Sequence, residues 1–149
     1  MMPRLTNDDT REAAKKWIVT YAEAWLNHDV EKILPLFSAK AVYSSHPFRD
    51  RYVGREAIRD YTSWAFSTEE SVHGVKFGEP TIEGSRAVVE YWTTMKERGK
   101  DVTLAGAIFL KFGADGLCTE LREYWDTREG IENPPRGWGW QAGTSETKS

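Results

Sequence analysis

The stretch from Asp101 to Asp126, DVTLAGAIFLKFGADGLCTELREYWD, most restricts what this chain can fold into. Its first part, Val102 to Phe112, carries almost no charge, and its second, Leu117 to Asp126, alternates apolar and polar residues. Between them lies Gly113-Ala114-Asp115-Gly116, a turn sequence, because glycine takes positive φ without steric cost. Two such runs joined by a short glycine-containing loop are typical of an antiparallel hairpin.

One face of this hairpin is predicted to be apolar with a single carboxylate, because side chains alternate faces along a strand. A carboxylate on an apolar surface indicates either a site or a shifted register. The alternative for Glu123 is therefore a β-bulge that turns it towards solvent. The predicted face consists of Val102, Leu104, Gly106, Ile108, Leu110 and Phe112 on the first strand and Leu117, Leu121, Glu123 and Trp125 on the second.

Helical periodicity precedes the strands and predicts three helices. Asn7 or Asp8 can cap the first, which ends near Asn27. Asp29 caps a short second helix, which Pro35 should kink or shorten. The apolar positions are Ala13, Ala14, Trp17, Ile18, Tyr21 and Trp25 in the first helix, Val30, Ile33, Leu34 and Phe37 in the second, and Ile58, Tyr61 and Ala65 in a third after Gly54, with Trp64 near its edge.

The remaining segments favour strands. Residues 41–45 form a short β-prone run that ends at His46-Pro47, where a loop to Gly54 begins. Residues 72–82 and 86–95 follow, and either face of 86–95 can point inward. Three helices followed by long antiparallel strands are typical of the α+β class. A curved, mixed and mostly antiparallel sheet with helices on one face leaves a cone-shaped space, where small apolar ligands bind.

Length and composition favour one domain of an ordinary globular chain. The 149 residues contain no apolar run long enough to span a membrane, and the net charge of −3 is scattered, which argues against nucleic-acid binding. The single Cys118 and the polar N-terminus are typical of a cytoplasmic protein. No His, Cys, Asp or Glu spacing is typical of a metal site. We predict a domain over 8–127 and a tail over 128–149, whose Trp138 and Trp140 dock and whose last eight or so residues are disordered.

Several motifs resemble those of the nuclear-transport-factor-two-like superfamily, in its SnoaL-like and ketosteroid-isomerase-like branch. They are Tyr21-Ala-Glu-Ala-Trp25-Leu-Asn-His-Asp29, Ala41-Val42, His46-Pro47, Gly54-Arg-Glu-Ala-Ile58, Asp115-Gly116-Leu117 and Tyr124-Trp125. The resemblance covers roughly residues 10 to 127. It implies a cone-shaped α+β barrel, but it does not specify the reaction, because this fold hosts many functions.

Carried over residue by residue, the resemblance implies an altered active site. Tyr21 matches the tyrosine that donates to the enolate oxygen of steroid isomerases, and His46, directly before Pro47, matches their general base, with Ser45 as the rival. Ile108 stands where they have a protonated aspartate, and Glu123 where they have a small apolar pocket residue. Steroid isomerisation is therefore not expected, and a SnoaL-like cyclase or related enzyme remains open.

Three residues are candidates for catalysis. His46 can accept and return a proton near physiological pH, although a loop histidine at the surface is the simpler reading. Tyr21 can donate to an oxyanion or be one more ring of the core. Glu123 can pair with His46 or act as a second acid. The substrate-binding residues expected around them are Trp25, Phe37, Tyr61, Trp64, Gly106, Ile108, Leu121 and Trp125.

Two functions follow from these residues. The first is a cofactor-free isomerase, cyclase or dehydratase acting by proton transfer on a small apolar, carbonyl-bearing substrate. The second is a non-catalytic ligand-binding or assembly module. In either case the open sheet, with an apolar outer face, predicts a homodimer.

Overall fold

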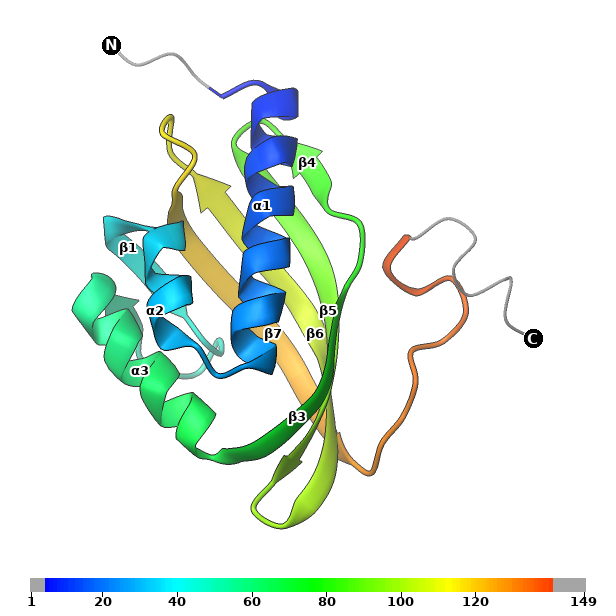
Figure 1. Ribbon diagram of the computed structural model, residues 1–149. Helices are drawn as coiled ribbons and strands as arrows, with labels where there is room; N and C mark the ends of the chain where they lie inside the picture. The colour runs from blue at the N-terminus through cyan, green and yellow to red at the C-terminus, as the bar shows by residue number, and fades with distance from the viewer. Residues whose placement is uncertain (1–4, 141–149) are drawn as a thin grey trace.

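In a computed structural model, which describes residues 5–140, three helices lie on one face of a curved seven-stranded sheet (Figure 1). The helices are α1 (Asn7–Leu26), α2 (Val30–Ile33) and α3 (Arg55–Ser67), with 3-10 segments η1 (Leu34–Leu36) and η2 (Trp138–Trp140). The strands are β1 (Phe37–Ser44), β2 (Tyr52–Val53), β3 (Glu69–Phe77), β4 (Thr81–Glu83), β5 (Arg86–Glu97), β6 (Lys100–Phe112) and β7 (Cys118–Glu129). The predicted α+β class is confirmed.

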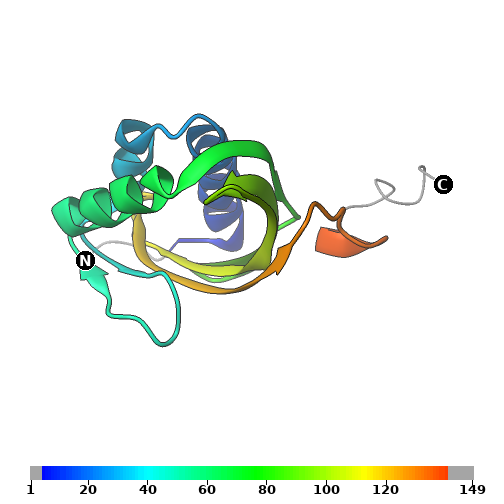
Figure 2. The ribbon, with the colours of Figure 1, turned by 90° about the horizontal axis from the view of Figure 1, so that it is seen from below.

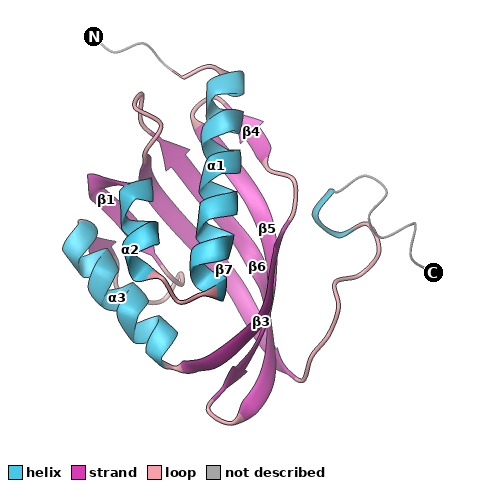
Figure 3. Cartoon of the chain, in the orientation of Figure 1, coloured by secondary structure: helices cyan, strands magenta, loops and turns pink. Residues whose placement is uncertain are grey.

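The sheet order is β2-β1-β7-β6-β5-β3, with β4 paired to β5. Only β1 and β7 pair in parallel, so the sheet is mixed and mostly antiparallel. The helices and the strands separate into two layers (Figure 3). Seen from below, the sheet bends around towards the helices, and β3 arches from α3 over to the rest of the sheet (Figure 2).

The predicted hairpin is formed by β6 and β7, and Glu123 lies on its inner face opposite Ile108. A register shift separates Lys111 from Phe112 and places Cys118, not Leu117, opposite Phe112. The prediction was therefore wrong for Leu117, because a bulge next to the turn offsets the alternation by one residue. Beyond the bulge the alternation holds, and Glu123 is only 8% exposed.

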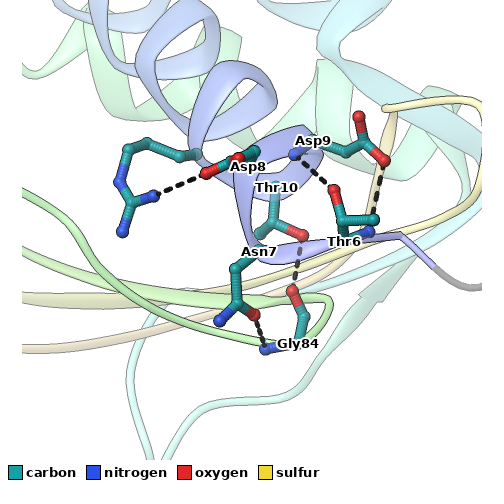
Figure 4. Close-up of polar contacts among 7 residues, drawn as sticks. Thr6, Asn7, Asp8, Asp9, Thr10 and Gly84 are labelled. Carbon is teal, nitrogen blue, oxygen red and sulfur yellow. Dashed lines mark hydrogen bonds and ion pairs between the residues drawn. The ribbon is translucent and has the colours of Figure 1, made fainter.

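The first helix is fixed at its beginning by two sets of hydrogen bonds (Figure 4). Thr6, rather than Asn7 or Asp8, is the N-cap, and it forms a capping box with Asp9. Asn7 and Thr10 bind the backbone of Gly84 in the β4–β5 turn, Asn7 accepting from its N–H at 2.8 Å and Thr10 donating to its oxygen at 2.5 Å. The capped end of α1 is thereby joined to the sheet.

The second helix has the predicted Asp29 cap, which accepts from the Lys32 N–H, but it ends earlier than expected. Pro35 lies in η1, and Phe37 already has the extended geometry of β1. Placing Phe37 in a helix was therefore wrong. Its ring is fully buried, and its centroid lies 6.5 Å from that of the Trp17 ring and 5.9 Å from that of the Tyr43 ring.

The inner face of β5 is settled by burial. Val89, Tyr91, Thr93 and Met95 are buried, whereas the alternate positions from Val88 to Thr94 are half-buried on the outer side. The inner residues of β5, β6 and β7 pack against the apolar side of α1, which carries Ala14, Trp17, Tyr21, Ala24 and Trp25. Across residues 5–140 no helix is long and apolar enough to span a membrane.

The tail follows the outer side of the sheet as far as residue 140. Trp92 of β5 donates its indole N–H to the Glu132 carbonyl at 2.7 Å and packs edge-on against Trp138. Trp138 therefore docks as predicted, whereas the Trp140 side chain is 78% exposed. The expected disorder of the last residues concerns a segment outside the described residues, and the division into 8–127 and 128–149 remains a prediction.

Candidate functional site

A cavity of about 290 Å³ lies between the helices and the inner face of the sheet. Most of its lining is aromatic or charged. Its aromatic side chains are Tyr21, Trp25, Tyr43, Tyr61, Trp64, Phe66 and Trp125, and its charged ones are Arg49, Glu69, Glu97, Arg98 and Glu123. Apolar walls with a few converging polar groups are typical of a small-molecule site.

A carboxylate and three tyrosines are joined by hydrogen bonds at this cavity. Tyr43 donates its hydroxyl to Oε1 of Glu123 at 2.5 Å, and Tyr91 donates to Oε2 at 2.9 Å. The hydroxyls of Tyr21 and Tyr43 are 3.0 Å apart, and either can be the donor. One helix and three strands thus contribute to a single network, in which Tyr21, Tyr43 and Glu123 also line the cavity.

Burial changes the acidity of every member of this network. It raises the pKa of Glu123 from 4.5 to about 7, against the opposing effects of the two tyrosine hydrogen bonds and of the positive charge on Arg49. Burial, followed by the nearby charge of Glu123, raises the pKa values of Tyr21, Tyr43 and Tyr91 well above 10, so these phenols stay protonated. A carboxyl group with a pKa near neutrality can both accept and donate a proton under physiological conditions.

Glu69, at the start of β3, places a second carboxylate in the cavity wall. Its Oε1 accepts from the Trp25 indole at 3.1 Å and contacts Nε2 of His28 at 3.0 Å. Burial raises the pKa of Glu69, and both hydrogen bonds oppose that rise. The imidazole of His28 stacks on Phe66 with ring centroids 4.8 Å apart. The backbone of His28 has a positive φ of 53°, in the break between α1 and α2.

The loop after β1 brings a cation to the same cavity. The guanidinium of Arg49 lies 5.3 Å from the centre of the Trp125 ring, a cation–π distance. The ring of His46 meets the same indole edge-on at 5.0 Å. The Trp125 N–H donates to the carbonyl of Ser45 at 2.6 Å, which fixes the indole beneath both side chains.

The structure brings together some of the residues that the sequence singled out. Tyr21 and Glu123 belong to one network, and Trp25, Tyr61, Trp64 and Trp125 line the cavity with them. His46 is not among the lining residues and lies beside Trp125. The other four expected substrate-binding residues lie outside the lining: Phe37, Ile108 and Leu121 are fully buried in the core, and Gly106 contacts the β7 backbone.

Sequence reasoning missed Tyr43, Tyr91, Glu69 and Arg49. Tyr43 and Tyr91 stand at alternating positions of their strands, but only the sheet order shows that both reach Glu123. Glu69 follows Thr68 without a distinguishing motif. Within the described part of the chain, no group of three or more His, Cys, Asp or Glu side chains is arranged to hold a metal ion.

The sequence matches one family model, described as the SnoaL-like domain, over residues 18–121. No curated protein matches it significantly.

Solved structures share its fold at low sequence identity. The epoxide hydrolase/cyclase-like enzyme SalBIII, studied for pyran ring formation in the polyether salinomycin, superposes with a TM-score of 0.69 at 17% identity, over 83% of this chain and 97% of that one. A protein with a ketosteroid isomerase-like fold from Catenulispora acidiphila DSM 44928, solved in complex with trimethylamine, has a TM-score of 0.65 at 20% identity. The match covers 72% of this chain and 83% of that one. A candidate polyketide cyclase from Xanthomonas campestris pv. campestris has a TM-score of 0.65 at 19% identity. The match covers 78% of this chain and 93% of that one.

Proposed function

The chain belongs to the SnoaL-like domain family, and from that premise and the geometry of the cavity we propose that it is a small cofactor-free enzyme of the isomerase, cyclase or dehydratase type. It moves protons on a small, mostly apolar substrate that carries a carbonyl or similar oxygen. The observation that carries the proposal is Glu123: a buried carboxyl at the cavity, held by two tyrosines, with a pKa of about 7.

Glu123 supplies the base in this mechanism. While it is ionised, it accepts from Tyr43, whose oxygen can in turn accept from Tyr21. The carboxylate removes a proton from the carbon adjacent to the substrate carbonyl. The C–H electron pair forms a carbon–carbon double bond, and the π electrons of the carbonyl move onto its oxygen. Geometry favours Glu123 over His46 in this role, because only Glu123 is among the lining residues.

Tyr21 stabilises the charge that forms. Once Glu123 has taken the proton, it can donate to Tyr43, and Tyr43 can then donate to Tyr21. The Tyr21 hydroxyl is thereby freed to donate to the substrate oxygen, where negative charge develops. Return of the proton from Glu123 to a different substrate atom completes an isomerisation, and its delivery to a leaving oxygen completes a dehydration.

A test needs an activated carbon acid, and 5-nitrobenzisoxazole serves because a base removes its ring proton as the N–O bond breaks to give a coloured phenolate. We expect turnover that rises with pH through about 7. The change Glu123→Gln should lower the rate on the order of 100-fold, as for loss of a general base. Glu120→Gln, a carboxyl on the same strand outside this cavity, is the control. Full turnover by Glu123→Gln, with its fold intact by circular dichroism, contradicts the proposal.

The alternative function is a non-catalytic holder of small ligands. The cavity's many aromatic rings favour it, as does the similar Catenulispora protein, which was solved with trimethylamine. A holder would bind ligand without turning over any carbon acid, so the same assay distinguishes the two functions.

We also propose a cytoplasmic homodimer that forms through the outer face of the sheet. Phe109 and Tyr124 are 38% and 43% exposed there and pack edge-on against each other. The buried free thiol of Cys118 fits a reducing compartment. Sedimentation velocity at micromolar concentration should show a dimer, and a monomer would contradict this assembly.

A further inference from the structure

We propose that Arg49 and His46, held against Trp125, form a binding site for a carboxylate group of the substrate. The inference rests on the proposed function, because it takes the cavity as the substrate site. It narrows the substrate class to small, mostly apolar molecules that carry one carboxylate besides the reacting oxygen.

A tight turn positions both side chains. The backbone N–H of Arg49 donates to the carbonyl of His46 at 3.2 Å, so residues three apart are brought side by side. Both then reach one indole, with His46 edge-on at 5.0 Å and the Arg49 guanidinium at 5.3 Å from the ring centre. Because the Trp125 N–H is bound to Ser45, the platform beneath them is fixed before any ligand arrives.

Both side chains have donors for an anion. Nδ1 of His46 accepts from the backbone N–H of Phe48 at 3.3 Å, so a neutral imidazole carries its proton on Nε2. Between residues 5 and 140, no carboxylate lies within ion-pairing distance of Arg49, although the sequence has 23 acidic and 20 basic residues. A guanidinium presents a planar fork that matches both oxygens of a carboxylate.

The cation lies close enough to act on the reacting end of the cavity. Its charge lowers the pKa values of both Glu123 and Tyr61, against the larger effect of burial. The other acids of the lining are bound by neighbouring side chains, Glu69 by Trp25 and His28 and Glu97 by Thr68. They come from β3 and β5, whereas Trp125 and Glu123 belong to β7, with β6 between β7 and β5.

One polar group of the lining lacks a hydrogen-bond partner in the described residues. The Oγ1 of Thr62 in α3 is buried and makes no hydrogen bond. Such a group is costly unless something satisfies it.

The test compares cyclohexanecarboxylate with cyclohexanecarboxamide by isothermal titration calorimetry. They have similar shapes, and only the first is an anion. We expect the carboxylate to bind more tightly than the amide by a factor on the order of 10, the range for charge-assisted hydrogen bonds. Arg49→Gln should remove this preference by weakening carboxylate binding alone, and His46→Gln should reduce it.

Arg51→Gln is the matched control, since Arg51 is an exposed cation of the same loop and does not line the cavity. It should retain the preference. Equal affinities for the two probes, no carboxylate binding at millimolar concentration, or a preference that survives Arg49→Gln would overturn the carboxylate site.

Glu123→Gln separates this inference from the proposed function. If that variant loses 5-nitrobenzisoxazole turnover and still prefers the carboxylate, both proposals hold. If it keeps full turnover, the catalytic proposal fails, whereas the Arg49→Gln titration still decides the binding site.

Discussion

Burial of the Glu123 carboxyl disfavours its charged form, and the resulting rise in its pKa makes it suitable as a base near neutral pH. Enclosure in the core disfavours its charge, and two phenols partly compensate by donating to its two oxygens. A fully compensated carboxylate would have a low pKa and be a poor base. The incomplete compensation leaves the pKa of Glu123 near neutrality.

The pH dependence of stability should reveal this pKa. Between pH 4.5 and 7 the folded protein keeps a proton on Glu123 that the unfolded chain has lost, so its contribution to the unfolding free energy falls as pH rises. A shift of this size corresponds to about 3 kcal/mol. Glu69, whose pKa is also raised, acts in the same direction. The measurement is therefore urea unfolding of wild type and Glu123→Gln at pH 5 and pH 8.

The difference in unfolding free energy between the two proteins should change by about 2.5 kcal/mol between pH 5 and pH 8, in favour of Glu123→Gln at the higher pH. The variant keeps one charge state throughout, so effects of all other groups cancel. An unchanged difference would mean that Glu123 titrates alike in both states, and its role as a base would lose support.

For single residues, the sequence predicts which face of a strand or helix a side chain occupies better than it predicts which residue that side chain contacts. Strand alternation and the family resemblance together pointed to Tyr21 and Glu123. The hydroxyl of Tyr43, which joins them, depends on β1 lying beside β7. That parallel pairing joins segments far apart in the sequence, and no local pattern encodes it.

Among the elements, the β6–β7 hairpin has one position, Gly106, where any side chain would collide with the neighbouring strand. Gly106 faces Trp125 in the ladder, and a Cβ built on it would lie 2.7 Å from the Trp125 Cβ. The glycine is thus needed for close approach and not for backbone flexibility. It allows Trp125 to sit where the loop after β1 can reach it.

Gly106→Ala should therefore destabilise the protein by about 1–3 kcal/mol, the usual cost of overpacking. Gly74→Ala is the matched control, because a Cβ on Gly74 of β3 would find its nearest neighbour, the Thr94 hydroxyl, at 3.8 Å. Urea denaturation of both variants measures the difference. Equal stabilities would show that β6 and β7 can separate at no cost.

Element boundaries were predictable where a cap or a break is local. Asp29 caps α2 as expected, and the uninterrupted run of strands from β3 onward begins directly after Thr68. Phe37 was misplaced because its apolar character fits a helix as well as a strand. What decides its geometry is Pro35, which turns the chain through η1 and directly into β1.

In the whole molecule, layers were predictable and the cavity was not. Helices first and strands afterwards restrict the chain to an α+β arrangement, and the family resemblance adds the curvature. The cavity depends on which side chains fill the space between the layers. The side chains of Ile108 and Leu121 are buried in the core. Arg49, from a loop, and Glu69, from the start of β3, line the cavity instead.

The contact between the tail and the sheet has a practical consequence for anyone who modifies this protein. Gly139 packs so closely on Gly78 that a Cβ added to Gly78 would lie 2.5 Å from the Cα of Gly139. The Gly139 carbonyl also accepts a hydrogen bond from the Glu79 N–H at 2.7 Å. A shortened version that stops at the end of β7 would leave this backbone unprotected. Fusion tags and truncations are therefore best placed after Trp140.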